Sequence, residues 1–230
     1  MFGYPVCTVR VQDKRVRQVR VLLVEDHDFT RTTVAASLRS EQCKVVASVP
    51  SARDALRAIE DHQIDCAVID LNLGVGPNGL DLAHRLRDED PNIGIVLLTT
   101  FKDPRLLARD RRSLPIGSVY LVKDDVRTTS QMREAIDAAL DNVQMKGKTP
   151  SSNKPTRLPL TDTQIEILRM VAEGLTNAEI AGRRGVSTRA VQTAMTRILT
   201  TAQIEPDPSV NVRVQLVKYY QSLGGSTVVN

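Results

Sequence analysis

Polar residues with chemically useful side chains stand where four short apolar runs of this chain end. They are Glu25 and Asp26 after Val21–Val24, Asp70 after Cys66–Ile69, Thr99 after Ile95–Leu98, and Lys123 after Val119–Val122. If the runs are parallel strands, their carboxyl ends open onto one crevice, and these side chains converge there. Three carboxylates, a hydroxyl and an ammonium group can together hold a hard divalent cation and receive a phosphoryl group.

The elements that position these residues follow an alternating pattern from Val19 to Asn142. Short β-rich runs alternate with amphipathic helical stretches, which is typical of βαβ units around a parallel sheet. We expect five strands and five helices, with a strand at Lys44–Val49 and the last helix at Ser130–Leu140. The helix-start signals are Asp28, Ser51 with Asp54, and Asp103-Pro104. The fold class predicted for residues 19–142 is therefore a doubly wound α/β domain.

The stretch 143–159 reads VQMKGKTPSSNKPTRLP and has no apolar period. It predicts a flexible linker between two domains. At the other end of the chain, residues 1–18 alternate Val with basic residues. That arm could be a strand or could touch DNA, and we expect it to be poorly ordered.

A small all-α domain is expected over residues 160–230. Thr161 with Gln164 and Thr176 with Glu179 form two capping boxes, and Ser187 begins a further helix after a Gly-Val turn. Two short helices joined by a glycine-containing turn are the ingredients of a helix-turn-helix.

Residues 19–142, with their five polar strand ends in this order, resemble the receiver domain of two-component response regulators. The resemblance implies that Asp70 is the phospho-acceptor, that Thr99 and Lys123 are the functional hydroxyl and lysine, and that Tyr120 is the aromatic switch residue. It also implies Mg²⁺ bound in an octahedral oxygen shell. The metal ligands expected on this basis are Glu25, Asp26, Asp70 and the backbone carbonyl of Asn72.

The second domain resembles the LuxR-type helix-turn-helix of the NarL/FixJ subfamily. The motifs are Leu160-Thr161, Glu166, Gly174-Leu175-Thr176-Asn177, Glu179-Ile180-Ala181, Val186-Ser187 and Val191. The recognition helix is predicted at Thr188–Thr200, with an apolar face of Val191, Ala194, Met195 and Ile198. The DNA-binding candidates on the remaining surface are Arg189, Gln192, Thr193, Thr196 and Arg197.

Two features of this domain stay open at the level of sequence. The family often has Lys where this chain has Gln192, so the preferred DNA sequence can differ. Val210, Val214 and Val217 fit a fourth helix, which the resemblance implies is a dimerisation surface. The alternation of Val210, Val212 and Val214 also fits a strand.

Charge and composition agree with this division. Residues 1–20 carry a net charge of +4, residues 21–150 of −3 and residues 151–230 of +3, which sum to the overall +4. An acidic domain followed by a basic one fits a cation site joined to a binder of polyanions. Three cysteines without metal-ligand spacing, no signal peptide and no membrane-length apolar run predict a cytoplasmic protein with no membrane partner.

Some motifs point elsewhere. Residues 74–79 spell G-x-G-x-x-G, but the motif follows the third strand and contains Pro77, so we interpret it as a false dinucleotide signal. A nucleotide-dependent enzyme built on that loop is nevertheless an alternative. The three histidines assemble no catalytic triad or zinc site. Thr100 stands where receivers usually have Ala, and its larger side chain could slow access by phosphodonors.

The resemblances together imply a transcriptional response regulator that is phosphorylated on Asp70 by a sensor histidine kinase. They imply that it binds double-stranded DNA, forms a phosphorylation-dependent homodimer, and has no enzyme activity beyond its own phosphorylation and dephosphorylation. The remaining alternative is a phosphorylation-independent regulator whose receiver serves only for dimerisation or interaction. Thr100 and an extra residue in the 74–79 loop keep that alternative open.

Overall fold

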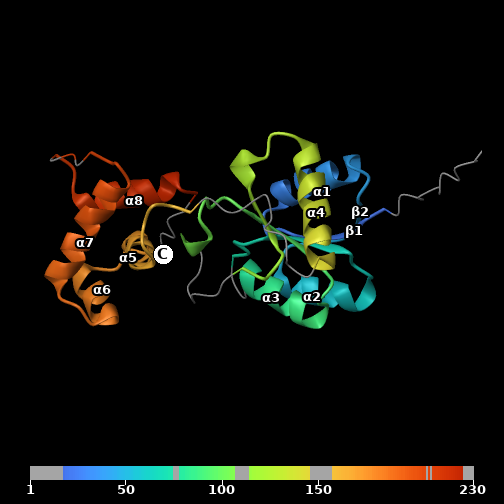
Figure 1. Ribbon diagram of the computed structural model, residues 1–230, viewed down its shortest axis with the longest axis horizontal. Coiled ribbons are helices and arrows are strands. Elements are labelled where there is room, and N and C mark those ends of the chain that lie inside the picture. Colours follow the sequence, from blue (N-terminus) through green and yellow to red (C-terminus); the bar gives the residue numbers. More distant parts are fainter. Residues whose placement is uncertain are drawn as a thin grey trace, which may run out of the picture.

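A computed structural model describes residues 18–74, 78–106, 114–145, 157–205, 207 and 209–224. The described chain forms two lobes, an α/β domain and an all-helical domain (Figure 1). The predicted N-terminal arm and most of the predicted linker lie outside the described residues.

The first domain is built on one parallel sheet in the order β2-β1-β3-β4-β5. The strands are β1 Arg20–Val24, β2 Lys44–Val49, β3 Cys66–Asp70, β4 Gly94–Thr99 and β5 Val119–Val122. The three central strands are almost entirely buried, because helices cover both faces of the sheet. The predicted doubly wound fold and five-stranded sheet are therefore confirmed.

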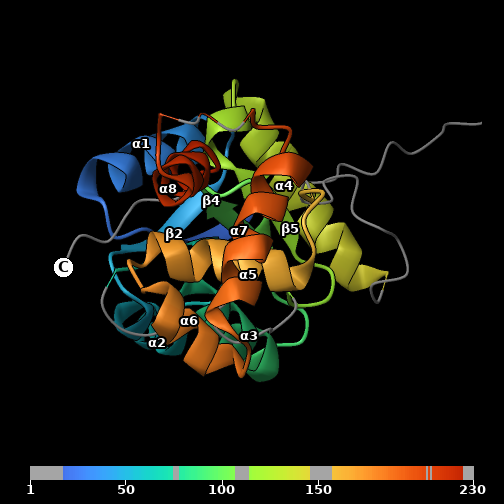
Figure 2. The ribbon, with the colours of Figure 1, turned by 90° about the vertical axis from the view of Figure 1, so that its left-hand side faces the viewer.

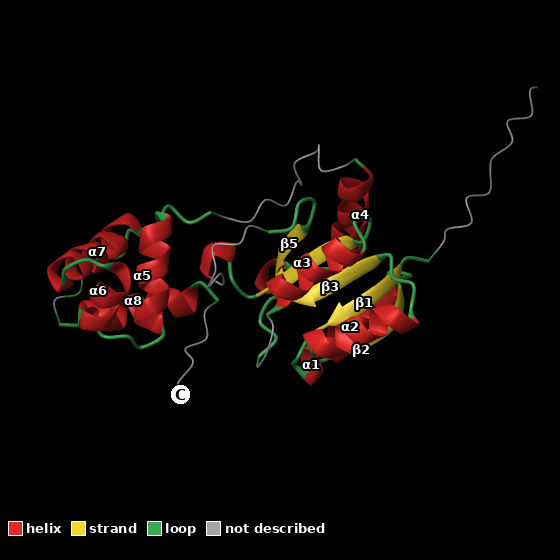
Figure 3. Cartoon of the chain, turned by 90° about the horizontal axis from the view of Figure 1, so that it is seen from below, coloured by secondary structure: helices red, strands yellow, loops and turns green. Residues whose placement is uncertain are grey.

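The helices lie in two layers against this sheet (Figures 1 and 3). One layer packs Leu38 and Ile136 against Val68, and the other packs Ala55 and Leu86 against Ile95. The first layer consists of α1 (Asp28–Ser40) and α4 (Thr129–Gln144), and the second of α2 (Ala52–Asp61) and α3 (Gly79–Glu89).

The connection between β4 and β5 differs from the other crossovers. Sequence predicted a helix beginning at Pro104, and the described part is a single 3-10 turn, η1, at Pro104–Leu106. Residues 107–113 lie outside the described residues. A second 3-10 turn, η2 at Lys123–Asp125, follows β5 directly. The segment that ends in η1 leaves the sheet and packs against the helical domain.

The helical domain contains α5 (Asp162–Ala172), α6 (Asn177–Arg184), α7 (Thr188–Thr201) and α8 (Val212–Ser222). Thr161 and Thr176 both form the predicted capping boxes, and Ser187 caps α7 through the Ala190 N–H. Gly185 ends α6 at φ 65°, a left-handed conformation that favours glycine. Figure 2 views this domain with α7 crossing in front of α5.

Two element boundaries differ from the sequence predictions. α4 starts at Thr129 and continues to Gln144, so the chain is still helical where the linker was expected to begin. Of the alternating valines, Val212 and Val214 lie in helix α8 and Val210 precedes it, and the buried Leu216 and Tyr220 recur at helical spacing. Among the described residues, no helix is both long and apolar enough to cross a bilayer.

Candidate functional site

The carboxyl ends of β1, β3 and β5 bring the acidic residues together. In the sheet register Val24 lies beside Ile69, so the residues that follow β1 reach the level of Asp70. One carboxylate oxygen from each of Glu25, Asp26 and Asp70 lies within 4.8 Å of the others. Glu25 and Asp70 are buried, at 1% and 5% exposure, whereas Asp26 faces solvent.

Lys123 reaches this cluster from the end of β5. Its Nζ lies 2.6 Å from Glu25 Oε2 and 2.8 Å from Asp70 Oδ2, and thus joins the two buried carboxylates. The remaining oxygen of Asp70, Oδ1, accepts a hydrogen bond of 3.1 Å from the Asn72 N–H. Three carboxylates and one ammonium leave a formal charge of −2, which a divalent cation would neutralise.

Burial controls the protonation of this cluster. Burial raises the pKa of Asp70 and the pKa of Glu25, and hydrogen bonds and attraction from Lys123 partly oppose both shifts. Burial acts to lower the pKa of Lys123, but the two carboxylates outweigh it and raise that pKa. The lysine therefore stays cationic, and the negative charge of the pocket is held at a free-energy cost that a bound cation would relieve.

Two glycines of the G-x-G-x-x-G stretch serve the acidic cluster. A Cβ on Gly79 would lie 2.0 Å from the Asp70 carbonyl oxygen, which only glycine permits. Gly74 has φ 64°, and a Cβ there would lie 3.1 Å from Asp26 Oδ2. Asn78 caps α3 by accepting from the Asp81 N–H. Packing against Asp26 and Asp70 therefore explains why glycine stands at positions 74 and 79. Residues 75–77 lie outside the described residues.

The sequence did not indicate a role for Arg31, whose side chain donates to the backbone of the loop that follows β1. Its Nη1 donates to the carbonyl oxygens of Glu25, at 2.8 Å, and Asp26, at 3.3 Å, and its guanidinium also pairs with Asp28. Arg31 follows Asp28 by three positions on α1, a spacing that could have indicated the ion pair but not the contacts with the loop.

Thr99 and Tyr120 meet at the backbone of one residue, Phe101. Thr99 is fully buried, and its Oγ1 accepts from the Phe101 N–H at 3.2 Å. The Tyr120 hydroxyl donates to the Phe101 carbonyl oxygen at 2.7 Å. Burial raises the pKa of Tyr120, partly opposed by a hydrogen bond with Thr99. Tyr120 is only 3% exposed, so its ring points into the domain.

Thr100 makes a contact that its sequence position did not indicate. Its Oγ1 donates to the Gly224 carbonyl oxygen at 3.0 Å, across the boundary between the two domains. The hydroxyl is thus directed at the helical domain.

The candidate DNA-reading face of α7 is exposed as predicted from sequence. Val191, Met195 and Ile198 are buried. The exposed residues include all five candidates, Arg189, Gln192, Thr193, Thr196 and Arg197.

The threonines on this face are partly committed to their own helix. The Thr193 hydroxyl donates to the Arg189 carbonyl oxygen at 3.0 Å, and the Thr196 hydroxyl to that of Gln192 at 3.3 Å. Such threonines present a methyl group and a lone pair outward.

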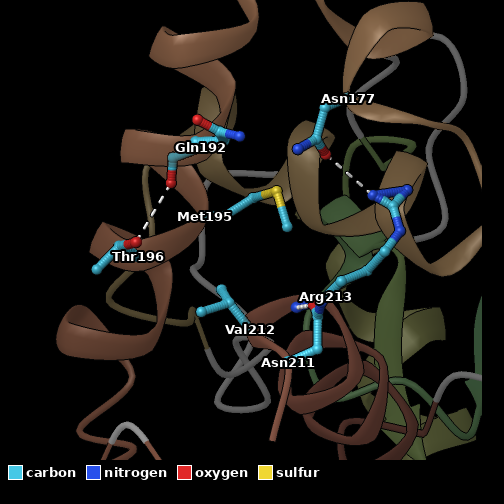
Figure 4. Close-up of a pocket in the computed structure, with 7 residues that line it drawn as sticks. All are labelled: Asn177, Gln192, Met195, Thr196, Asn211, Val212 and Arg213. Carbon is cyan, nitrogen blue, oxygen red and sulfur yellow. Dashed lines mark hydrogen bonds between the residues drawn. The ribbon is translucent and has the colours of Figure 1, made fainter. Parts of the chain in front are cut away.

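A pocket of about 320 Å³ lies beside Gln192, between α7, the start of α6 and the start of α8 (Figure 4). The Met195 side chain extends into it, and Arg213 Nη1 donates to Asn177 Oδ1 at 3.1 Å on its opposite side. The pocket is lined by Asn177, Gln192, Met195, Thr196, Asn211, Val212 and Arg213. It adjoins the exposed face of α7 and is separate from the acidic cluster.

Both domains match known families. Residues 21–112 match the response regulator receiver domain, and residues 158–203 match the bacterial regulatory proteins of the luxR family. The chain is 26% identical over 209 residues to the oxygen regulatory protein NreC of Staphylococcus epidermidis, covering 84% of this chain and 94% of the relative. It is 28% identical over 199 residues to the methanol utilization control regulatory protein MoxX of Paracoccus denitrificans, covering 80% and 85%.

Solved structures share the fold at lower identity. The two-component response regulator RcsB in complex with DNA aligns over 90% of this chain and 99% of its own, at a TM-score of 0.53 and 18% identity. RcsB from Salmonella enterica serovar Typhimurium, bound to promoter P1flhDC with the phosphomimetic BeF₃⁻, aligns over 89% and 99%, at 0.51 and 20%.

A receiver domain followed by a DNA-binding helix-turn-helix defines a transcriptional response regulator. The LuxR-type output domain and the NreC-like relatives place this chain in the NarL/FixJ type of that class. The predicted family is therefore confirmed.

Proposed function

We propose that this regulator is switched by transfer of a phosphoryl group to Asp70. The observation that carries the proposal is the convergence of Glu25, Asp26 and Asp70 within 4.8 Å, with Lys123 bonded to Asp70. A carboxylate oxygen of Asp70 attacks the phosphorus of a phosphohistidine on a sensor histidine kinase. The P–N bond breaks, and the imidazole leaves with a proton from solvent. Lys123 stabilises negative charge on the phosphoryl oxygens.

The cofactor proposed for this step is Mg²⁺. Glu25, Asp26 and Asp70 would hold it, with the Asn72 backbone carbonyl as a further ligand, since hard oxygen donors with net negative charge suit this ion. When bound, the cation would neutralise charge on the transferring group. Glu25 and Asp70 each share an oxygen with Lys123, and the exposed Asp26 completes the acidic set.

We further propose that two output domains bind an inverted DNA repeat as a homodimer. Each recognition helix α7 would enter a major groove, with half-sites about one helical turn apart. The exposed Arg189 and Gln192 are proposed to read bases, and Arg197 to contact phosphate. The threonine methyl groups suit contact with thymine.

A phosphorylation-independent regulator is the second candidate, and one observation bears on it. It rests on the larger side chain of Thr100 and on the extra residue in the 74–79 loop, and the Thr100 hydroxyl donates to the Gly224 carbonyl oxygen. The contact directs the hydroxyl at the helical domain, and labelling of Asp70 distinguishes the two candidates.

Labelling by a small phosphodonor such as acetyl phosphate tests the proposed chemistry. Wild type should acquire one phosphoryl group by intact-mass measurement, only when Mg²⁺ is present, and Asp70→Asn should acquire none. Asp81→Asn, at a half-buried position in the first turn of α3 and outside the acidic cluster, is the matched control and should label normally. Failure of wild type to label, or equal labelling of Asp70→Asn, would rule out Asp70 as the acceptor.

A further inference from the structure

The loop between β1 and α1, residues 25–27, supplies two of the three carboxylates of the acidic cluster. We name it the acidic loop. Both of its ends are held by neighbouring elements. The Glu25 N–H donates to the Val49 carbonyl oxygen of β2 at 3.1 Å, and the His27 ring caps the start of α1. The residue between these two anchors is Asp26, whose position depends on other contacts.

The three carboxylates of the cluster are held in different ways. Lys123 bonds one oxygen of Glu25 and one of Asp70, and the Asn72 N–H bonds the other oxygen of Asp70. The Asp26 carboxylate is exposed, and among the described residues no hydrogen bond or ion pair fixes it. The place of this carboxylate is therefore set by the backbone from which it extends.

Arg31, near the start of α1, holds that backbone. Its side chain is only 18% exposed and folds back over the acidic loop. Its Nη1 donates to the carbonyl oxygen of Glu25 at 2.8 Å and to that of Asp26 at 3.3 Å. These two carbonyl groups belong to the peptides on either side of the Asp26 Cα. A single guanidinium nitrogen thus fixes both peptide groups from which the direction of the Asp26 side chain follows.

The charge of Arg31 is offset beside the loop. A guanidinium this close to a cation site would by itself repel a divalent ion. Its other terminal nitrogen, Nη2, pairs with Asp28, whose side chain is 89% exposed. The pair adds no net charge, so the formal charge of −2 on the three carboxylates and Lys123 remains available to a cation.

Mg²⁺ and Ca²⁺ place different demands on such a loop. Mg²⁺ requires a nearly ideal octahedron of oxygen atoms, whereas Ca²⁺ is larger and accepts six to eight oxygens in a flexible arrangement. A carboxylate on a fixed backbone suits the first ion, and a carboxylate on a mobile backbone suits the second. Residues that orient metal ligands typically change metal affinity about 10- to 100-fold when they are substituted.

From these contacts we propose that Arg31 is a positioning residue that makes the acidic cluster selective for Mg²⁺ over Ca²⁺. It acts through the backbone of Asp26, and Asp28 cancels the repulsion that its charge would otherwise exert on the cation. The inference rests on the Mg²⁺ site proposed above and assigns the selectivity of that site to a residue outside the ligand set.

The sign of the effect separates positioning from charge. Arg31→Met removes a positive charge, so an effect of charge alone would tighten the binding of both cations. Loss of positioning would weaken the binding, and would weaken Mg²⁺ more than Ca²⁺. Asp28→Asn leaves the bonds from Arg31 to the two carbonyl groups in place and removes a negative charge. It should therefore weaken both cations by the same factor.

Isothermal titration calorimetry of full-length protein with MgCl₂ and with CaCl₂ measures these affinities. The proteins compared are wild type, Arg31→Met, Arg31→Lys and Asp28→Asn. Arg39→Met is the matched control, because it removes the same charge from an exposed position in the last turn of α1. Urea denaturation without divalent cations shows whether each variant is folded.

Arg31→Met should lower Mg²⁺ affinity about 10- to 100-fold and Ca²⁺ affinity less than about 10-fold. Arg31→Lys keeps the charge but lacks the planar guanidinium, so it should shift the ratio of the two affinities in the same direction by a smaller factor. It decides the question if Arg31→Met does not fold. A ratio equal to that of wild type in the folded Arg31 variants, or tighter binding of both cations, would overturn the proposal.

Failure of the proposed function gives a different pattern. If wild type binds neither cation, the Mg²⁺ site is rejected, and the role of Arg31 is rejected with it. If wild type binds Mg²⁺ and Arg31→Met binds both cations as wild type does, the Mg²⁺ site stands and only the role of Arg31 is rejected.

Discussion

The acidic cluster of Glu25, Asp26 and Asp70 and the exposed face of α7 are proposed to carry the two activities of this regulator, and they are built in opposite ways. The pocket gathers Glu25, Asp70 and Lys123 from strands far apart in sequence and keeps the two carboxylates almost fully buried. The face of α7 presents residues of one helix, such as Arg189 and Gln192, directly to solvent. Charge in the pocket is therefore tied to folding stability, whereas residues on α7 can change binding with little effect on stability.

The largest effect is expected for Lys123→Met, which removes the only cation bonded to the two buried carboxylates in the described pocket. We expect a loss of about 3–5 kcal/mol in unfolding free energy near neutral pH, measured by urea denaturation. Removing the charge at an exposed position, as in Lys218→Met on α8, should cost less than about 0.5 kcal/mol.

The unfolding free energy of Lys123→Met should depend on pH in a defined direction. Burial raises the folded-state pKa of Asp70 and Glu25, so these groups contribute stability at low pH that is lost as the pH rises through those pKa values. Acidification should therefore reduce the difference in unfolding free energy between Lys123→Met and wild type. A difference in unfolding free energy that is small at neutral pH, or that increases on acidification, would show that the ion pairs of Lys123 with Glu25 and Asp70 do not stabilise the fold.

The next prediction concerns the DNA sequence specificity of α7, and substitution of Gln192 should leave the unfolding free energy unchanged. If Gln192 reads adenine, as we favour because an amide can pair twice with that base, Gln192→Lys should cost about 1–3 kcal/mol at one base pair. If Gln192 instead faces a phosphate, the variant should bind all sequences more tightly and steepen the salt dependence by about one unit per helix. Salt titrations on specific and scrambled duplexes separate the two.

Arg189→Ala supplies the companion measurement on the same helix. It should weaken binding under either interpretation of Gln192, because Arg189 is exposed at the start of α7. If neither variant changes affinity for any duplex, α7 is not the reading helix.

A matched pair of threonine substitutions gives the smallest expected effects and sharpens the comparison. Thr99→Val in the pocket leaves the buried Phe101 N–H without its acceptor and should cost about 1–2 kcal/mol. Thr196→Val on α7 removes a hydroxyl that bonds only its own helix at the surface, and should cost less than about 0.5 kcal/mol. Equal costs in thermal denaturation would contradict the proposed difference between the regions.

The sequence predicted most of both regions because their determinants are local. Strand ends locate Asp70 and Lys123, β2 spans Lys44–Val49 as expected, and the capping residues Thr161 and Thr176 begin their helices where predicted. Hydrophobic period and caps act within a few residues, so they can be read from the chain itself.

What the sequence could not provide are contacts between distant segments. Phe101 and Leu106 look like receiver core residues, and no periodicity indicates that they pack in the output domain. The Asp103-Pro104 signal predicted a helix start, yet Asp103 instead pairs with Arg105 and the residues before α5. The need for glycine at 224 likewise depends on Thr100, a residue 124 positions away.

The central claim is that the state of Asp70 controls DNA binding, and one measurement addresses it directly. The affinity of full-length protein for its operator is measured at fixed salt with Mg²⁺, with and without beryllofluoride, for wild type and Asp70→Asn. We predict that the mimic tightens binding of wild type by about 5- to 150-fold and leaves Asp70→Asn unchanged. An equal affinity of wild type with and without the mimic, while beryllofluoride is bound, would contradict the account.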